Sequence, residues 1–121
     1  MSGRAFRGAM AHHGGLAAEE QVAAAYAARG ATVLARRWRD GGAEIDLVLE
    51  EAGTVVFVEV KRAATHAAAA ARIAPAQVAR LLAAAEAFLG TRPAGALTDS
   101  RFDAALVDGA GRVEILRDAF L

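Results

Sequence analysis

The sequence predicts an α/β fold in which helices cover a central mixed β-sheet. Two alanine-rich segments with helical periodicity flank a block of three strand-like runs, and two more such runs follow, which gives the order α-β-β-β-α-β-β. Large apolar residues are concentrated in those runs rather than spread along the chain. With 121 residues, the chain has the length of one domain and enough material to bury a core.

The first helix is predicted from Gly15 to Gly30. Alanine gives this segment a strong helix propensity. Val22, Ala23 and Tyr26 recur at the spacing of one helix face. Gly30 suits the position just after a helix, where a left-handed backbone is common.

Three strands are predicted next, at Ala31–Trp38, Ala43–Glu50 and Thr54–Lys61. The turn Asp40–Gly42 separates the first two, and the short loop Glu51–Gly53 joins the last two into a hairpin. Both faces of the third strand begin with apolar side chains. We therefore expect this strand to be central and buried on both sides.

The second half of the chain is predicted to contain a helix and a hairpin. The alanine-rich segment 63–74 is compatible with a loop, a helical extension or a disordered lid. Pro75 suits the first turn of the helix that follows. This helix is expected to end at Leu89 and to pack through Val78, Leu81, Leu82, Ala85 and Leu89. Arg101–Val107 and Arg112–Leu116 are predicted to pair across a short turn.

Composition narrows the class of protein. The chain contains no cysteine, which excludes disulfides and thiolate metal sites and favours a cytoplasmic location. Its 14 basic residues equal its 14 acidic ones, unlike a protein that coats nucleic acid through bulk charge. No apolar run reaches about 18 residues, so no membrane span is expected. We expect residues 1–14 to be a mobile tail without the apolar part of a signal peptide, and 15–121 to be a single domain.

Asp46, Glu59 and Lys61 are charged residues within the apolar strands. Glu59 and Lys61 are two positions apart, so both side chains leave the same face of their strand. If Asp46 lies beside Glu59, two carboxylates about 5 Å apart repel by roughly 3 kcal/mol at an effective dielectric of ~20. Mg²⁺ held by oxygens would offset this repulsion. Such an ion activates water and binds a phosphate oxygen, and an ammonium stabilises developing charge, so the pattern fits phosphodiester hydrolysis.

A hairpin with ordinary cross-strand ion pairs, each worth about 0.2–1 kcal/mol, is the alternative interpretation. Two observations favour the metal site. Glu59 lies within FVEVK, the most apolar strand, where a bare charge is costly. Lys61 is the only lysine among the basic residues, and its compact ammonium differs physically from a guanidinium. The residues by themselves leave both interpretations open.

The run GAEIDLVLEEAGTVVFVEVKR, residues 42–62, strongly resembles the YraN family of bacterial proteins. Members of this family look like small nucleases of the PD-(D/E)xK, restriction-endonuclease-like superfamily, with a layout similar to archaeal Holliday-junction resolvases. The resemblance covers almost the whole chain, and EID (44–46) and FVEVK (57–61) are its specific part. It implies a restriction-endonuclease-like fold and a metal-dependent nuclease acting on DNA, with structure-specific cleavage as one form of this activity.

The resemblance also implies roles for individual residues. Asp46 and Glu59 would ligate Mg²⁺ or Mn²⁺, with help from the carbonyl of Val60. Lys61 would act on the attacking water or on the phosphate, and Glu19 would complete the acidic cluster.

The chain departs from the family pattern at three places. After Lys61, where the family has a glycine-containing loop, this chain has AATHAAAAARIAP. Ala43 replaces a glycine, which is a mild change. Gln77 stands where the family has a lysine, which weakens the case for tight phosphate binding, although some related nucleases have glutamine on this helix. The residues expected to contact nucleic acid are Arg36, Arg37, Arg62 and Gln77, with Arg39 and Arg72 as further candidates.

Two other functions stay open at this point. A non-catalytic nucleic-acid-binding module would retain the fold without the chemistry, and the net charge of +0 and Gln77 favour it. A protein-interaction subunit would offer the hairpin edge or the alanine-rich segment to a partner. A homodimer or a protein partner could supply target selectivity, for which a chain of this size has little room.

Overall fold

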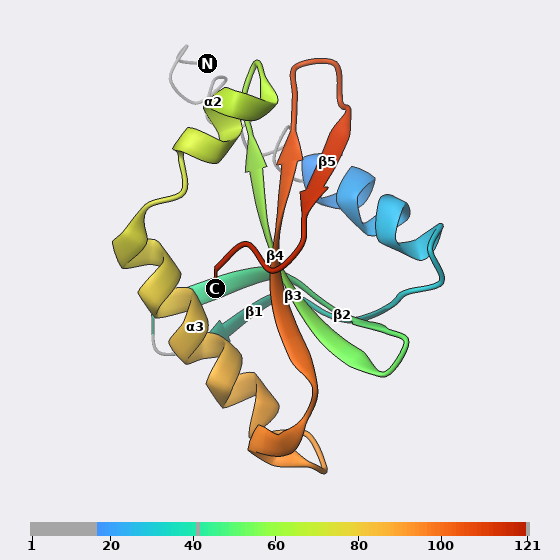
Figure 1. Ribbon diagram of the computed structural model, residues 1–121, viewed down its shortest axis with the longest axis vertical. Coiled ribbons are helices and arrows are strands. Elements are labelled where there is room, and N and C mark those ends of the chain that lie inside the picture. Colours follow the sequence, from blue (N-terminus) through green and yellow to red (C-terminus); the bar gives the residue numbers. More distant parts are fainter. Residues whose placement is uncertain (1–16, 41, 121) are drawn as a thin grey trace, which may run out of the picture.

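Helices lie on both faces of a five-stranded sheet in the computed structural model of the chain, which describes residues 17–40 and 42–120 (Figure 1). The first helix is described over 17–27. The elements that follow are β1 (Thr32–Asp40), β2 (Ala43–Glu51), β3 (Thr54–Arg62), α2 (His66–Ala71), α3 (Pro75–Leu89), the 3₁₀ turn η1 (Gly95–Leu97), β4 (Ser100–Val107) and β5 (Val113–Leu116). The predicted α/β class and element order are confirmed, and the arrangement is consistent with a restriction-endonuclease-like fold.

The strands lie side by side in chain order, β1-β2-β3-β4-β5. Only β3 and β4 are parallel, whereas the other neighbours are antiparallel. A parallel pair needs a crossover connection, and α2 and α3 provide it between the end of β3 and the start of β4. β3 is the middle strand, as predicted, because it is apolar on both faces.

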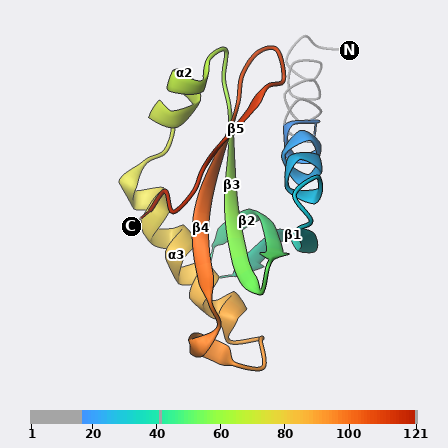
Figure 2. The ribbon, with the colours of Figure 1, turned by 45° about the vertical axis from the view of Figure 1, so that its right-hand side comes forward.

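The alternation of side chains along β3 creates two cores, one on each face of the sheet. The core under the first helix includes Val56, Val58, Val22 and Tyr26. The core under α3 includes Val55, Phe57, Leu81 and Phe88. Figure 2 shows the first helix and α3 on opposite sides of the strands.

β2 and β3 separate before either strand ends, which opens a fork in the sheet. Their pairing runs from Glu51↔Thr54 to Leu47↔Val58. Beyond this point β3 stays paired with β4, whereas β2 stays paired with β1 (Figure 1). The first part of β2 and the last part of β3 therefore border an open space.

The alternation of β2 changes phase at Asp46. Ile45 faces the α3 core, but Leu47, two residues later, faces the first helix. The neighbouring strand is irregular at the same place, because Arg37 has a φ of 50°, a conformation uncommon for residues other than glycine. At this irregularity the Asp46 carboxylate reaches across to β3, where it accepts a hydrogen bond from Val60 N.

A buried hydrogen-bond network joins the first helix to β4. Asp103 is 0 % exposed, and its carboxylate accepts hydrogen bonds from the Tyr26 hydroxyl at 2.7 Å and from Arg101 Nε at 3.0 Å. Burial, together with the bond to Asp103, raises the pKa of Tyr26 well above its ordinary value. Asp103 is thus a paired residue of the sheet.

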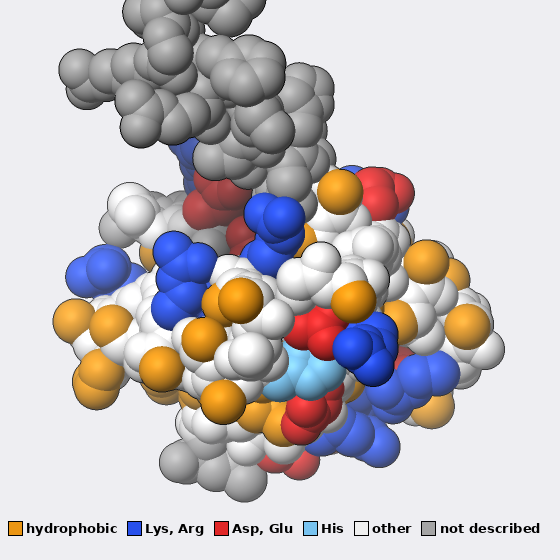
Figure 3. All heavy atoms as spheres, turned by 90° about the horizontal axis from the view of Figure 1, so that it is seen from above, with side chains coloured by type: hydrophobic (Ala, Val, Ile, Leu, Met, Phe, Trp, Pro, Cys, Tyr) orange, Lys and Arg blue, Asp and Glu red, His pale blue; other side chains and the backbone are white. Residues whose placement is uncertain are grey.

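The alanine-rich segment after β3 forms a short helix that is tied to the β4–β5 turn. Gly109 N donates to the carbonyl of Ala64 at 3.1 Å. The ring of His66 contacts the Arg112 carbonyl through Nε2 at 2.9 Å and the Glu114 carboxylate through Nδ1 at 3.0 Å. Figure 3 shows a histidine side chain between acidic side chains on this face of the molecule. Segment 63–74 therefore contains a separate short helix, His66–Ala71, with non-helical residues before and after it, and not a continuous extension of α3.

A few boundaries and faces differ from the expectation. Leu82 was expected on the buried face of α3 but is 41 % exposed. Ala84 and Phe88, which were not expected there, are buried, so the buried face of α3 is rotated around the helix axis relative to the prediction. β1 begins and ends later than predicted, and the helical turns of the first helix end at 27. The predicted tail 1–14 lies outside the described residues. Among the described helices, none has the length and hydropathy needed to cross a membrane.

Candidate active site

Asp46, Glu59 and Lys61 come together at the fork between β2 and β3. Asp46 Oδ2 accepts a hydrogen bond of 2.8 Å from the N–H of Val60, a group freed by the separation of the two strands. Glu59 Oε1 lies 3.3 Å from Lys61 Nζ and 3.5 Å from Gln77 Nε2 of α3. The fork thus assembles residues from β2, β3 and α3 that the sequence places far apart.

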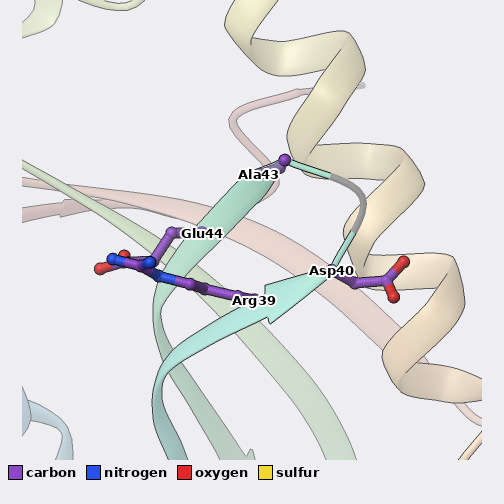
Figure 4. A pocket seen from close by; sticks show the side chains of 5 residues that line it. Arg39, Asp40, Ala43 and Glu44 are labelled. Atoms are coloured by element: carbon purple, nitrogen blue, oxygen red, sulfur yellow. The ribbon is translucent and has the colours of Figure 1, made fainter.

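Both carboxylates open into one hollow of about 280 Å³. It is lined by Gly42, Ala43, Glu44, Asp46, Glu59, Gln77, Arg80 and Leu81. A larger hollow of about 500 Å³ adjoins it, and the two share Gly42, Ala43 and Glu44 at the β1–β2 turn. In Figure 4, Arg39 and Glu44 of the larger hollow lie together, as their 2.8 Å ion pair requires, and Asp40 points away from them. The smaller hollow is the candidate site, because it contains the pair of carboxylates.

The carboxylates of Asp46 and Glu59 lie together in a poorly solvated environment. Glu59 is only 4 % exposed, and burial raises its pKa to about 8, with the charge of Asp46 adding to the effect. Burial also raises the pKa of Asp46, helped by the charge of Glu19 and opposed by the Val60 hydrogen bond. Glu59 Oε2 is buried and has no hydrogen-bond partner. The raised pKa values show that, without a cation, the two carboxylates resist being ionised at the same time.

Comparison of the sequence with known proteins places this chain in a family. The model of the uncharacterised protein family UPF0102 matches residues 18–107. The chain belongs to this family. The resemblance to YraN proteins is thereby confirmed.

Several UPF0102 proteins are similar over nearly their whole length. One from Cereibacter sphaeroides (strain ATCC 17025) is 50% identical over 113 residues, 93% of this chain and 97% of its own. One from Roseobacter denitrificans is 50% identical over 116 residues, 96% of this chain and 90% of its own. One from Ruegeria pomeroyi is 48% identical over 120 residues, 99% of this chain and 98% of its own. The matched region of the UPF0102 model contains every candidate site residue from Glu19 to Arg80.

The fork of this UPF0102 chain suits a hydrated divalent cation. No three His, Asp or Glu side chains in 17–40 and 42–120 converge closely enough to hold a metal by themselves. Mg²⁺ usually takes one or two carboxylates and keeps several waters. Asp46 and Glu59 match that requirement, and the unpartnered Glu59 Oε2 is an oxygen that a cation would satisfy. Since N–H and C=O of one strand residue point to the same edge, the Val60 carbonyl also borders the fork.

Glu19 lies near the fork but is held by an ion pair. Arg37 Nε and Nη2 lie 3.1 and 3.4 Å from its two carboxylate oxygens. The neighbouring Arg36 is paired in the same way with Glu20 of the first helix. Direct metal binding by Glu19 and DNA binding by Arg36 and Arg37 therefore stay predictions. Either contact would require the ion pairs Arg37–Glu19 and Arg36–Glu20 to break first.

The remaining candidates are divided between the two faces of the sheet. Gln77 lies in the candidate site, and its contact with nucleic acid stays a prediction. Arg62 lines a different hollow, of about 240 Å³, together with Ala17 and Gln21 of the first helix. Arg80 in the candidate site was missed from the sequence. Its position three residues after Gln77, on the same helix face, was the available signal.

Proposed function

We propose that this UPF0102 protein is a Mg²⁺- or Mn²⁺-dependent nuclease that hydrolyses phosphodiester bonds in DNA. One observation carries the proposal: Asp46, Glu59 and Lys61 meet at the fork, and a buried oxygen of Glu59 lacks a partner. Glu51 also has a buried oxygen without a partner, but Arg29 and Arg101 both pair with that residue. Glu59 differs because a second carboxylate, that of Asp46, lines the same hollow, and a cation would satisfy both.

The chemistry would be divided among a few groups. Asp46 and Glu59, with the Val60 carbonyl, would hold the cation, which supplies a polarised phosphate oxygen and a more acidic water. The Lys61 ammonium is bound to Glu59 here and its side chain is 17 % exposed. Once a cation takes over the charge of Glu59, Lys61 can turn to the phosphate or the water and stabilise the charge that develops. The Gln77 amide, also bound to Glu59, can orient that carboxylate.

A titration of Mg²⁺ and Mn²⁺ against branched, flapped, single-stranded and double-stranded DNA tests this proposal. We expect metal-dependent products from the wild type and a loss of about 100-fold or more for Asp46→Asn and Lys61→Met. Glu44→Gln is the matched control, because Glu44 lines the same hollow but is paired with Arg39 away from the fork. Equal cleavage by the wild type and both site variants, at equal thermal stability, would reject the assignment.

The same titration separates the alternatives. A non-catalytic nucleic-acid-binding module would bind these substrates and yield no metal-dependent product, and the neutral Gln77 at the site favours this second candidate. A protein-interaction subunit would show no binding even at low salt, where electrostatic attachment is strongest. Measuring the mass of the active species decides whether a homodimer or partner contributes.

A further inference from the structure

Among the described residues, some arginine and lysine side chains are paired with a carboxylate and others are not. The arginines of β1 are each paired with a glutamate, and Lys61 is paired with Glu59. The arginines near the ends of β4 and α3 are also paired. In 17–40 and 42–120, Arg62, Arg72 and Arg80 have no carboxylate partner. A substrate phosphate can therefore contact these three without breaking an existing ion pair.

Arg72 and Arg80 lie on the same side of the sheet as the candidate site. Arg80 lines the hollow that contains Asp46 and Glu59. Arg72, at the end of α2, donates through Nη1 to the carbonyl of Arg62 at 2.7 Å, which places it at the end of β3 just beyond Lys61. Both residues are exposed, and α2 and α3 lie together on the side opposite the first helix (Figure 2).

Arg72 retains most of its hydrogen-bonding capacity. A guanidinium has five N–H donors, and only the Nη1 group of Arg72 is bonded to another described residue. The planar guanidinium fork matches phosphate geometry and binds it through two parallel hydrogen bonds. The existing bond to a backbone carbonyl holds the group in place, so less side-chain freedom is lost when a phosphate binds.

The side chain of Arg62 points to the other face of the sheet from those of Arg72 and Arg80. Arg62 follows Lys61 on the same strand, so its side chain leaves the opposite face of β3. There it lines the hollow beside the first helix. Arg62 is exposed and unpaired like the other two, but it faces away from the candidate site, so the nucleic-acid contact expected from the sequence for Arg62 is not part of the path inferred here.

We propose that Arg72 and Arg80 bind two backbone phosphates of the substrate beside the Asp46–Glu59 pair. A nucleic acid strand then follows the α2–α3 side of the sheet, and the arginines of β1 keep their glutamate partners. This inference rests on the proposed function, because it takes the fork as the place where a phosphate reacts. Two such contacts correspond to a slope of about −2 in log affinity against log salt for duplex DNA.

Binding of the full-length protein to fluorescent duplex and branched DNA, in EDTA over a salt series, tests the proposal. Arg72→Ala and Arg80→Ala should each weaken binding several-fold at low salt and reduce the salt slope by about 1. Arg62→Ala and Arg92→Ala are matched controls, because each also removes one positive charge. The first is unpaired on the opposite face, and the second, just beyond the other end of α3, is paired with Glu50. Circular dichroism melting of each variant separates lost binding from lost folding.

Each outcome has a defined meaning. If both controls weaken binding as much as the test variants, net charge alone matters and the inference is wrong. If the wild type cleaves DNA and all four variants share its slope, the inference fails while the nuclease function stands. If the slopes change as expected but Mg²⁺ and Mn²⁺ yield no products, the phosphate contacts stand and the nuclease function fails. If the wild type binds no DNA at low salt, both are rejected.

Discussion

Replacing Glu59 by glutamine should change how the stability of the metal-free protein depends on pH. Glu59 is 4 % exposed in the middle of β3, close to Asp46. Burial and the charge of Asp46 raise its pKa from 4.5 to about 8. Glutamine has nearly the same shape and carries no charge at any of these pH values.

The direction of the effect follows from proton binding. Between pH 4.5 and about 8, Glu59 holds its proton in the folded protein and has released it in the unfolded chain. The folded state therefore binds more protons, and the free energy of unfolding falls as the pH rises through this window. At about 1.36 kcal/mol per pH unit, the fall attributable to Glu59 amounts to up to ~5 kcal/mol.

Urea unfolding in EDTA, at steps from pH 5 to pH 9, measures this fall in the wild type and in Glu59→Gln. The difference between the two curves isolates Glu59, because all other titrating groups are common to both. We expect similar stabilities near pH 5 and a variant more stable by a few kcal/mol near pH 9. Mg²⁺ or Mn²⁺ added at pH 9 should stabilise the wild type and have less effect on the variant, since a cation neutralises the ionised carboxylate.

Two results would refute this reasoning. Parallel pH curves for the wild type and Glu59→Gln would show that the folded protein does not hold the Glu59 proton more tightly than the unfolded chain. A variant less stable at every pH would show that the ionised carboxylate is stabilised by its surroundings, as an ordinary ion pair with Lys61 would be. Glu86→Gln, on the exposed side of α3, controls for the loss of one surface carboxylate.

Three further substitutions test other parts of the fold by urea unfolding. Tyr26→Phe removes the 2.7 Å donor of the buried Asp103 carboxylate and should cost about 1–3 kcal/mol; an unchanged stability would mean that another group takes its place. Phe88→Ala removes an edge-to-face contact with Trp38 and leaves a cavity under α3, at an expected cost of about 3–5 kcal/mol; a cost below about 1 kcal/mol would contradict the packing described. Ala52→Asn, at a turn position with φ of 51°, should stabilise the protein by up to about 1 kcal/mol, and a loss of stability would rule out the left-handed turn.

Much of the fold could be predicted from the sequence because the relevant signals are local. α3 begins and ends at the predicted residues, since Pro75 suits a first helical turn and Gly90 follows the last. The central position of β3 follows from its two apolar faces. The alanine-rich segment after β3 carried no such signal, because alanine has no apolar bulk that would reveal which face is buried.

Identifying the candidate site required both the sequence and the tertiary structure. By itself, the sequence determined that Asp46, Glu59 and Lys61 lie on adjacent apolar strands, because strand alternation and the hairpin turn are encoded by neighbouring residues. Only the tertiary structure decided that β2 and β3 part at Asp46, that Glu59 is left with a buried unpartnered oxygen, and which arginines are neutralised. The physical reason is that periodicity is a property of one segment, whereas desolvation and ion pairing depend on which distant segments meet.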